Sequence, residues 1–299
     1  MKQSVENLLR RLNLEEVGEN LFDGENEPTS WGRLFGGFVA AQALSAACRT
    51  VDDTRLPHSL HAYFLRPGDS KKHVTYAVDR IRDGKSFTTR RIVASQGERA
   101  IFNMAVSFHV AQPGYAHQHP MPDVPQPESL LGYDDYIERV TPQLSDSGSK
   151  IRYLMERPIE ARYQHVPSYL GGPLSDGPNA VWFRVSDEVP AEDQSMHRCL
   201  LTYASDLSLL DNAVRPHGRN GRLGSLQLAS LDHALWFHTR EINVNDWLLY
   251  YQDSPAARDA RGFTRGSIYT RDGILVASVA QEALMRPENP PEDGTESPG

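Results

Sequence analysis

The spacing of apolar and polar residues divides the chain into two similar parts. The first part begins with an apolar, alanine-rich stretch at 36–48, GGFVAAQALSAAC, which predicts a helix that is enclosed on most sides. Strand-like runs follow at 60–65, 73–78, 86–95 and 100–110. The last run places Phe102, Met104, Val106 and Phe108 on one face. Hairpin turns are indicated at Asp83-Gly84 and Gln96-Gly97, so the first part should be a helix with an antiparallel sheet.

The second part repeats this order of elements. It opens with a short apolar strand at 180–185, continues with a helix at 200–214, and adds strand-like runs at 226–237, 246–251, 262–270 and 274–283. Phe87, Thr88 and Gly97 recur as Phe263, Thr264 and Gly273, 176 residues later in each case. Two copies of a helix-and-sheet unit predict an α+β protein whose two sheets join side by side into one pseudo-symmetric sheet, with the helices on its concave face.

Composition shifts indicate the boundaries between these parts. Five prolines between Pro113 and Glu128 exclude regular structure there and predict a linker. We therefore expect an N-terminal unit at 1–112, a linker and connecting segment at 113–178, and a C-terminal unit at 179–287. The polar, proline-rich end at 288–299 should be disordered.

Charge and cysteine content limit the function. The 299 residues include 39 acidic and 31 basic side chains, a formal charge of -8, which argues against nucleic acid as the main partner. The two cysteines, Cys48 and Cys199, lie in apolar helical stretches and form no CxxC pair, which favours the reducing cytoplasm. The N-terminus lacks an uninterrupted apolar region, so neither a signal peptide nor a membrane span is expected, and the C-terminus lacks a peroxisomal tripeptide.

Several common chemistries have no motif in this chain. GxSxG, GxxxxGK[ST], HExxH and a GxGxxG after a strand are all absent from the sequence. His117 and His119 have no partner cluster, and a flexible loop explains them better than a metal site. What remains is a reaction that needs no metal or cofactor, or a binding function.

Five polar residues in or beside apolar runs are candidates for chemistry. Asp206 lies one position off the apolar stripe of the helix predicted at 200–214, and on that helix alone a solvated carboxylate is the favoured interpretation. Gln281 extends the apolar face of the last strand, where an amide needs a partner. Ser230 shares a face with Leu228 and is followed by Asp232-His233. Each of these residues, taken singly, is better explained by a structural role.

The whole chain resembles the type II acyl-CoA thioesterases, the double-hotdog enzymes related to bacterial thioesterase II and the peroxisomal acyl-CoA thioesterases. The resemblance rests on LFGG at 34–37 with QAL at 42–44, on HSLHAYFLRPGDSKK at 58–72, on RDG at 82–84 and on YASD at 203–206. It continues through LDH at 231–233, WFH at 236–238, WLLY at 247–250, ARGF at 260–263 and QE at 281–282.

The resemblance implies a catalytic triad and a reaction. In that family an Asp, a Thr or Ser, and a Gln orient the water that attacks the thioester, and these roles would fall on Asp206, Ser230 and Gln281. Serine in place of the threonine that related sequences often carry keeps the hydroxyl but loses its restricted rotamers. Asp206 would act as general base, although direct attack by its carboxylate would give a mixed anhydride instead. A helix start at Gly36 and Gly37 fits an oxyanion site.

CoA carries phosphates, so a basic rim is expected near the site. The candidates for substrate binding are Arg66, Lys71, Lys72, Arg90 and Arg91. A solvated turn and an edge strand are the favoured alternatives for the lysines and for the last two arginines. His58 also lies in a resembling motif, although hydrogen bonding at a strand end explains it better than catalysis.

Two other functions stay open at this point. A hotdog hydratase or dehydratase would favour an acid-base pair such as Asp232-His233, and a non-catalytic acyl-CoA sensor would use the same groove. The edges of the predicted sheet favour a homo-oligomer, a dimer or a tetramer. The expected substrate is a fatty acyl-CoA of lipid metabolism. The sequence pattern does not give the preferred length of the acyl chain.

Overall fold

The structure is a computed structural model that describes residues 2–26, 29, 32–140, 158–217 and 226–287. The helices are α1 (Gln3–Leu12), α2 (Gly36–Cys48), α3 (Tyr133–Val140), α5 (Gln194–Ser205) and α6 (Asp211–Val214), with the short 3-10 turns η1 (Pro127–Ser129) and η3 (Ser168–Leu170). None of these helices is long and apolar enough to span a membrane. The tail expected to be disordered, 288–299, lies outside the described residues.

All described strands belong to one antiparallel sheet. In the first half they are β1 (Glu15–Gly18), β2 (Leu21–Gly24), β3 (Arg55–Phe64), β4 (Val74–Asp83), β5 (Phe87–Gln96) and β6 (Arg99–Val110). In the second half they are β7 (Leu131–Gly132), β8 (Ile159–Tyr163), β9 (Asn179–Val185), β10 (Leu226–Ser230), β11 (Asp232–Phe237), β12 (Leu248–Arg258), β13 (Arg261–Thr270) and β14 (Leu275–Pro287). The strand order is β1-β2-β4-β5-β6-β3-β11-β14-β13-β12-β9-β8-β7, and β10 pairs with β14.

This strand order confirms the predicted pseudo-symmetry. The block β2-β4-β5-β6-β3 is repeated in reverse as β11-β14-β13-β12-β9, and the two blocks meet where β3 pairs antiparallel with β11. The recurring residues occupy equivalent places, since Thr88 and Thr264 are both buried. Gly97 and Gly273 close equivalent hairpins with positive φ angles of 61° and 92°. One continuous sheet therefore carries both halves.

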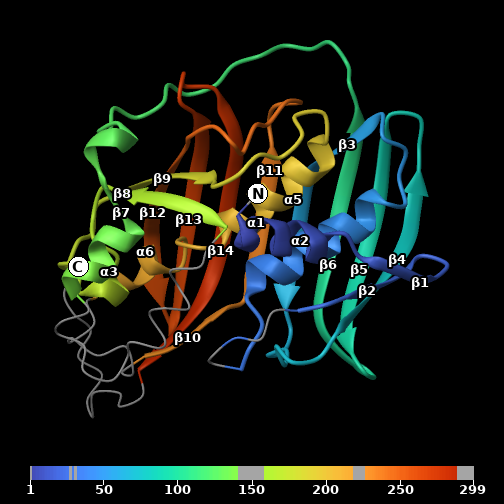
Figure 1. Ribbon diagram of the computed structural model, residues 1–299, viewed down its shortest axis with the longest axis horizontal. Helices are drawn as coiled ribbons and strands as arrows, with labels where there is room; N and C mark the ends of the chain where they lie inside the picture. The colour runs from blue at the N-terminus through green and yellow to red at the C-terminus, as the bar shows by residue number, and fades with distance from the viewer. Residues whose placement is uncertain (1, 27–28, 30–31, 141–157, 218–225, 288–299) are drawn as a thin grey trace.

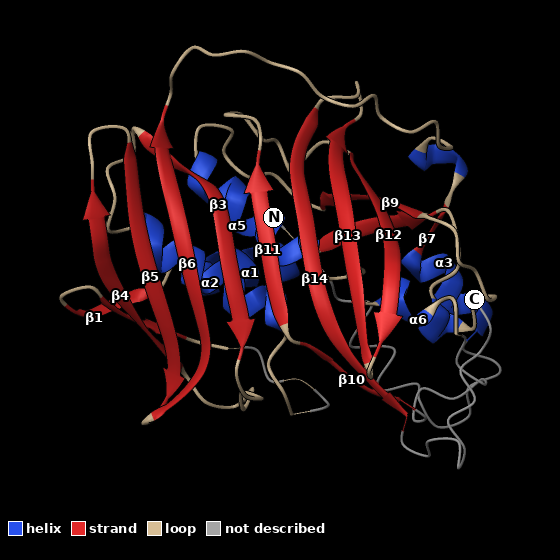
Figure 2. Cartoon of the chain, turned by 180° about the vertical axis from the view of Figure 1, so that it is seen from behind, coloured by secondary structure: helices blue, strands red, loops and turns tan. Residues whose placement is uncertain are grey.

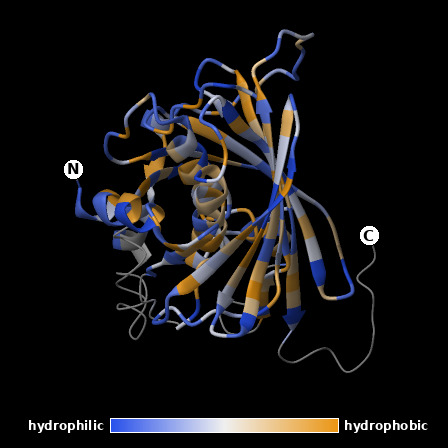
Figure 3. Cartoon of the chain, turned by 90° about the vertical axis from the view of Figure 1, so that its right-hand side faces the viewer, coloured by the Kyte–Doolittle hydropathy of each residue, from blue (hydrophilic) through white to orange (hydrophobic). Residues whose placement is uncertain are grey.

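The helices cover one face of this sheet. In Figure 1, α2 and α5 lie next to each other in front of the strands, with α1 over them, and Figure 3 shows the same helices from the side, inside the curve of the sheet. The view from behind in Figure 2 shows the strands of the outer face without any described helix over them. Helix α2 is buried on nearly all sides, as its composition predicts. Its small side chains let α5 and the sheet approach closely.

The structure corrects two elements of the sequence interpretation. The helix predicted at 200–214 ends at Ser205, and α6 forms a separate turn, so Asp206 stands at a helix end. The run at 226–237 is two strands, because Leu231 interrupts it: its N–H donates to Glu282 O and its carbonyl accepts from Phe64 N. The segment at 113–178 also contributes to the sheet, through β7 and β8.

Gly266 offers a test of the packing inside the second half. A Cβ atom added to this residue of β13 would lie 2.3 Å from the Tyr250 ring of β12, which is buried. We expect Gly266→Ala to lower the free energy of unfolding by about 1–3 kcal/mol through overpacking. The matched control is Gly114→Ala, because no atom lies within 4 Å of its added Cβ. Equal denaturation midpoints for both variants would contradict this packing.

Candidate active site

Asp206 lies at the point where the two halves of the protein meet. It is the residue that follows the last turn of α5, and only 9% of its surface is exposed. The first turn of α2, from the other half, is directly beside it. A Cβ atom added to Gly36 would lie 2.9 Å from Asp206 Oδ2, so only glycine fits between the carboxylate and the Phe64 ring. The solvated position that the helix pattern alone favoured is therefore wrong.

Two hydrogen bonds hold the Asp206 carboxylate. The backbone N–H of Gly37 donates to Oδ2 at 2.7 Å, and the Gln281 side chain on β14 donates through Nε2 to Oδ1, also at 2.7 Å. Gln281 itself is completely buried on the inner face of the sheet. Asp206 and Gln281 thus meet as the resemblance implies. The bond from Gly37 could not be read from the sequence, because 169 residues separate the two partners.

The surroundings of Asp206 tune its proton affinity. Burial disfavours the charged carboxylate and raises its pKa to about 6, whereas the hydrogen bonds from Gln281 and Gly37 act in the opposite direction. A carboxylate with a pKa near 6 is ionised at neutral pH and holds a proton better than an ordinary aspartate does. This balance suits a general base that works near neutral pH.

Ser230 lies on the same face of the sheet but is not bonded to the other two residues. It is the last residue of β10 and pairs with Ala283, whose buried side chain is two positions from Gln281 on β14. Residues that pair across antiparallel strands project to the same side. The Ser230 hydroxyl makes no hydrogen bond to Asp206 or Gln281. A molecule between them, such as water, is needed to connect it to the carboxylate.

His233 is a further buried polar residue next to this site. The Ser205 hydroxyl donates its proton to Thr202 O at 2.9 Å, so it must accept from His233 Nε2 at 2.8 Å. His233 Nε2 therefore carries a proton, and because burial lowers the pKa of His233 to about 4, the ring is neutral at neutral pH. The sequence interpretation treated His233 as a core residue or an acid-base partner and did not recognise this bond to Ser205.

Two acceptor atoms near Asp206 lack a donor in the described structure. They are His233 Nδ1 and Gln281 Oε1, and both are buried. The register that pairs Ala234 with Ala280 places His233 opposite Gln281 on the inner face. Buried acceptors of this kind are normally satisfied by protein groups or by ordered water. The site thus has acceptors for the protons of water beside a carboxylate that can act as a base.

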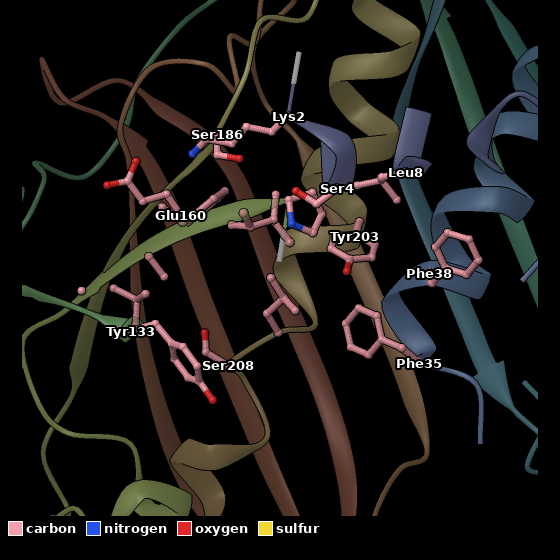
Figure 4. Close-up of a pocket in the computed structure, with 18 of the residues that line it drawn as sticks. Lys2, Ser4, Leu8, Phe35, Phe38, Tyr133, Glu160, Ser186, Tyr203 and Ser208 are labelled. Carbon is pink, nitrogen blue, oxygen red and sulfur yellow. The ribbon is translucent and has the colours of Figure 1, made fainter. Parts of the chain in front are cut away.

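A cavity of about 710 Å³ opens beside the residues that flank Asp206. Figure 4 shows Phe35, Phe38 and Tyr203 on one wall and Tyr133, Glu160 and Ser208 on another. The Phe35 and Tyr203 rings meet edge to face, with 5.2 Å between their centroids. Charged and polar side chains share the lining with these aromatic groups, among them Lys2, Arg11, Asp135, Glu160 and Arg162, so the cavity could hold an organic ligand that carries polar groups.

Three residues of the predicted basic rim stay candidates for substrate binding. Arg66, Lys71 and Lys72 are exposed on the loop between β3 and β4. This loop is tied to the stretch before α2, because Leu34 N donates to Gly68 O at 3.0 Å. The three side chains therefore lie on a segment attached to the entry of α2, where a phosphate could be bound.

The structure contradicts the substrate-binding role of three other residues. The Arg90 side chain is 1% exposed, and its guanidinium donates to Asp83 Oδ1 at 2.6 Å and to Thr50 Oγ1 at 2.9 Å, so it cannot reach CoA. Arg91 lies on the outer face of the sheet and pairs with Asp79. His58 is on the outer face as well, where its Nε2 is 2.8 Å from Ser107 Oγ. The sheet therefore separates Arg91 and His58 from Asp206.

Asp232 and His233 do not form an acid-base pair. His233 is buried on the inner face, whereas Asp232 is opposite the exposed Tyr63 on the outer face. Asp232 Oδ1 accepts from Glu282 N at 2.6 Å. Successive residues of a strand project to opposite faces, so the two side chains cannot act on one substrate.

The first half lacks an equivalent site. Thr264 pairs with Gln281 in the second half, and its counterpart Thr88 pairs with Phe108. Phe108 is fully buried and has no hydrogen-bonding group. The acidic and amide side chains of the site therefore come from the second half, and the Gly37 amide comes from the first.

Comparisons with known proteins agree with this architecture. The model of the acyl-CoA thioesterase N-terminal domain matches residues 26–109, and the acyl-CoA thioesterase model matches residues 149–284. Acyl-CoA thioesterase 2 of Haemophilus influenzae is 34% identical over 96% of this chain and 99% of its own length. Acyl-coenzyme A thioesterase 8 of Mus musculus is 37% identical over 92% of this chain and 87% of its own.

Solved structures give the same result. The acyl-CoA thioesterase II TesB2 from Mycobacterium marinum is 40% identical, covers 94% of this chain and 99% of its own, and superposes with a TM-score of 0.76. A hot dog fold protein of unknown function from Alicyclobacillus acidocaldarius superposes with a TM-score of 0.75 at 16% identity, over 95% of this chain and 99% of its own, which shows the fold alone. The chain belongs to the acyl-CoA thioesterase family and has its double-hotdog fold.

The raised pKa of Asp206 should be visible in the stability of the protein. Because folding favours the protonated carboxylate, its contribution to stability is complete below pH 4 and is lost as the pH rises through 6. Asp206→Asn removes this loss. The free energy of unfolding of the variant minus that of the wild type should therefore increase by about 3 kcal/mol between pH 4 and pH 7.5. Denaturant titrations across this pH range measure this difference. If the free energies of unfolding of the two proteins changed equally with pH, the raised pKa of Asp206 would be wrong.

Proposed function

We propose that this protein hydrolyses the thioester of fatty acyl-CoA to a free carboxylic acid and CoA, with Asp206, Ser230 and Gln281 as its catalytic residues. The observation that carries the proposal is the buried Asp206 carboxylate, held at one oxygen by Gly37 and at the other by Gln281. Membership of the acyl-CoA thioesterase family supports the same substrate.

In the proposed reaction, Asp206 acts as the general base. A water molecule next to the carboxylate gives it a proton as the water oxygen attacks the carbonyl carbon of the thioester. Gln281 donates to Asp206 and presents its free Oε1 to the water, so the amide orients both groups. The pKa near 6 lets Asp206 start ionised and still accept the proton.

The tetrahedral intermediate needs a donor for its oxyanion. The first N–H groups of a helix have no partner within the helix and attract negative charge. Gly37 N is used by Asp206, whereas Gly36 N donates to no described residue and is our candidate for this role. When the intermediate collapses, the C–S bond breaks and CoA leaves as a thiolate, which takes its proton from Asp206 or from solvent. A strong general acid is not needed, because a thiol has a pKa of about 8.5.

Ser230 completes the proposed set. It shares the inner face of the sheet with Gln281, and the Ser230 hydroxyl has no partner among the described residues. In this position it can bind the attacking water from the side opposite Gln281. Arg66, Lys71 and Lys72 are proposed to bind the phosphates of CoA from the loop beside α2.

The oligomeric state and the location remain part of this proposal. Strands β1 and β7 stand at the two ends of the described sheet, and their unpaired edges favour contact with a second copy of the chain in a dimer or tetramer. Sedimentation at a monomer mass would reject this. We place the protein in the cytoplasm, on the basis of its two unpaired cysteines.

Release of free thiol from a series of acyl-CoAs tests the main proposal. The wild type should be active, and Asp206→Asn should lower kcat by about 10²–10⁴-fold, because the variant loses its base. Glu138→Gln, on exposed α3, is the control for loss of a carboxylate and should keep full activity. If the wild type releases no thiol at any chain length, or if the Asn variant is as active, the proposal is wrong. The first result would favour the acyl-CoA sensor, and the second would show that hydrolysis uses a base other than Asp206.

The pH dependence of kcat/KM provides a second test. The rate should rise with pH through about 6 and then level off, because Asp206 must be ionised to act as a base. Gln281→Leu should move this acidic limb to higher pH, because the variant loses a hydrogen bond that lowers the pKa of Asp206. An unshifted limb in an active variant would show that another group titrates.

The hydroxyl at position 230 can be tested by a matched pair of substitutions. Ser230→Ala should lower kcat by roughly 2- to 10-fold, the value of one neutral hydrogen bond. Ser230→Thr keeps the hydroxyl in fewer rotamers and should retain or exceed the activity of the wild type. Equal kcat values for the Ala and Thr variants would remove Ser230 from the mechanism.

A further inference from the structure

Three polar side chains near the cavity have no role in the proposed hydrolysis. One is on α6, one is on β12, and one is on the turn before α6. They are Ser208, Asn212 and Gln252, of which Asn212 is 3% exposed and Gln252 is fully buried. Gln252 occupies an inward position of β12, two residues after the buried Tyr250. A buried amide pair is costly unless its groups are bonded, and in the described structure both polar groups of Gln252 and the Asn212 NH₂ group are bonded, whereas Asn212 Oδ1 has no partner.

The hydrogen bonds fix the direction of this network. Asn212 Nδ2 lies 3.2 Å from Ser208 O and 3.1 Å from Leu209 O, and a carbonyl oxygen can only accept. The Asn212 atom at this position is therefore the NH₂ group, and the Gln252 atom 2.7 Å from it must be the oxygen. The NH₂ group of Gln252 then faces Ser208 and donates to its Oγ at 2.7 Å.

This direction leaves the proton of the Ser208 hydroxyl available. Its oxygen already accepts from Gln252, and no described residue accepts its proton. Ser208 lines the cavity, and Figure 4 shows it on the wall beside Tyr133, facing the side of Phe35 and Tyr203. It is also two residues after Asp206, on the same turn between α5 and α6. The network thus presents one oriented donor to whatever occupies the cavity next to the base.

We propose that Ser208 is a substrate-recognition residue, whose hydroxyl donates a hydrogen bond to a carbonyl oxygen of the substrate other than that of the thioester, and that Asn212 and Gln252 are its positioning residues. The inference rests on the proposed hydrolysis of acyl-CoA and deepens it. Ser208 is half-buried, and an all-hydrocarbon ligand that covered it would leave this donor without an acceptor. The cavity therefore suits a ligand that carries a carbonyl near the thioester.

Two parts of an acyl-CoA can supply such a carbonyl. One is the amide nearest to sulfur in the pantetheine arm, and the other is a 3-oxo group on the acyl chain. The shared chemistry is a neutral carbonyl acceptor a few bonds from the thioester carbon. The two sources lie on opposite sides of the C–S bond, so substrates can be built with either, both or neither.

The experiment uses the full chain and four thioesters. Decanoyl and 3-oxodecanoyl groups are each joined to N-acetylcysteamine, which carries the amide, or to ethanethiol, which does not. We expect Ser208→Ala to lower kcat/KM by about 3- to 10-fold only for thioesters with the acceptor that Ser208 binds. Loss confined to the N-acetylcysteamine esters identifies the pantetheine amide, and loss confined to the 3-oxo esters identifies the acyl group.

Controls separate recognition from a general disturbance of the site. Ser208→Thr keeps the donor and should restore the selectivity. Ser129→Ala removes an exposed hydroxyl from η1, which does not line the cavity, and should change nothing. If Ser208→Ala lowers kcat/KM equally for all four esters, or for none of them, the proposed role of Ser208 is wrong. The proposed function is unaffected by that result as long as the wild type hydrolyses decanoyl-CoA. Failure of the wild type on decanoyl-CoA and on all other acyl-CoAs would instead reject the proposed function itself.

Discussion

The structure depends on one buried carboxylate that is bonded by both halves of the chain. Asp206 accepts from Gly37 of the first half and from Gln281 of the second, and it has little contact with solvent. Burying an ionised group is unfavourable unless its bonds are short and well directed. These bonds can form only because α2 packs against the end of α5, and the pairing of β3 with β11 holds the two halves in that arrangement. Burial of the ionised Asp206 side chain lowers the stability of the folded protein, and the same burial makes the carboxylate more basic.

Much of the fold follows from periodicity alone. The apolar run of α2 has the bounds of the helix, and the alternation around Phe102 and Met104 places these side chains in the core. Both glycines expected in hairpins, Gly97 and Gly273, have the positive φ angles that a tight turn requires. These features depend on neighbours a few residues away, which is why the pattern is sufficient. The end of α5 at Ser205 was missed, because the apolar spacing continues past it through Leu209 and Val214.

The candidate site was less accessible to sequence reasoning. Alternation placed Gln281 on an apolar face, and it could have identified Arg90, which shares the inner face of β5 with Thr88 and Ile92. The same argument applies to Gln252 on β12, which was overlooked. The helix pattern made Asp206 a candidate but favoured a solvated position, and only the resemblance to a family gave it the role of a base. Its partner Gly37 and the bond between Ser205 and His233 join residues far apart in the chain, and a one-dimensional pattern carries no information about such contacts.

The position of Gln281 on the last strand has a consequence for biosynthesis. β14 pairs with β10, β11 and β13, so the centre of the second half has no strand between β11 and β13 until this segment has been made. Gly37 leaves the ribosome first, Asp206 follows 169 residues later, and Gln281 follows 75 residues after that. A nascent chain therefore lacks one of the proposed catalytic groups until Gln281 has been made. Hydrolytic activity can arise only after the whole sheet has been assembled, so a truncated product of translation would be inert toward the thioester pool of the cell.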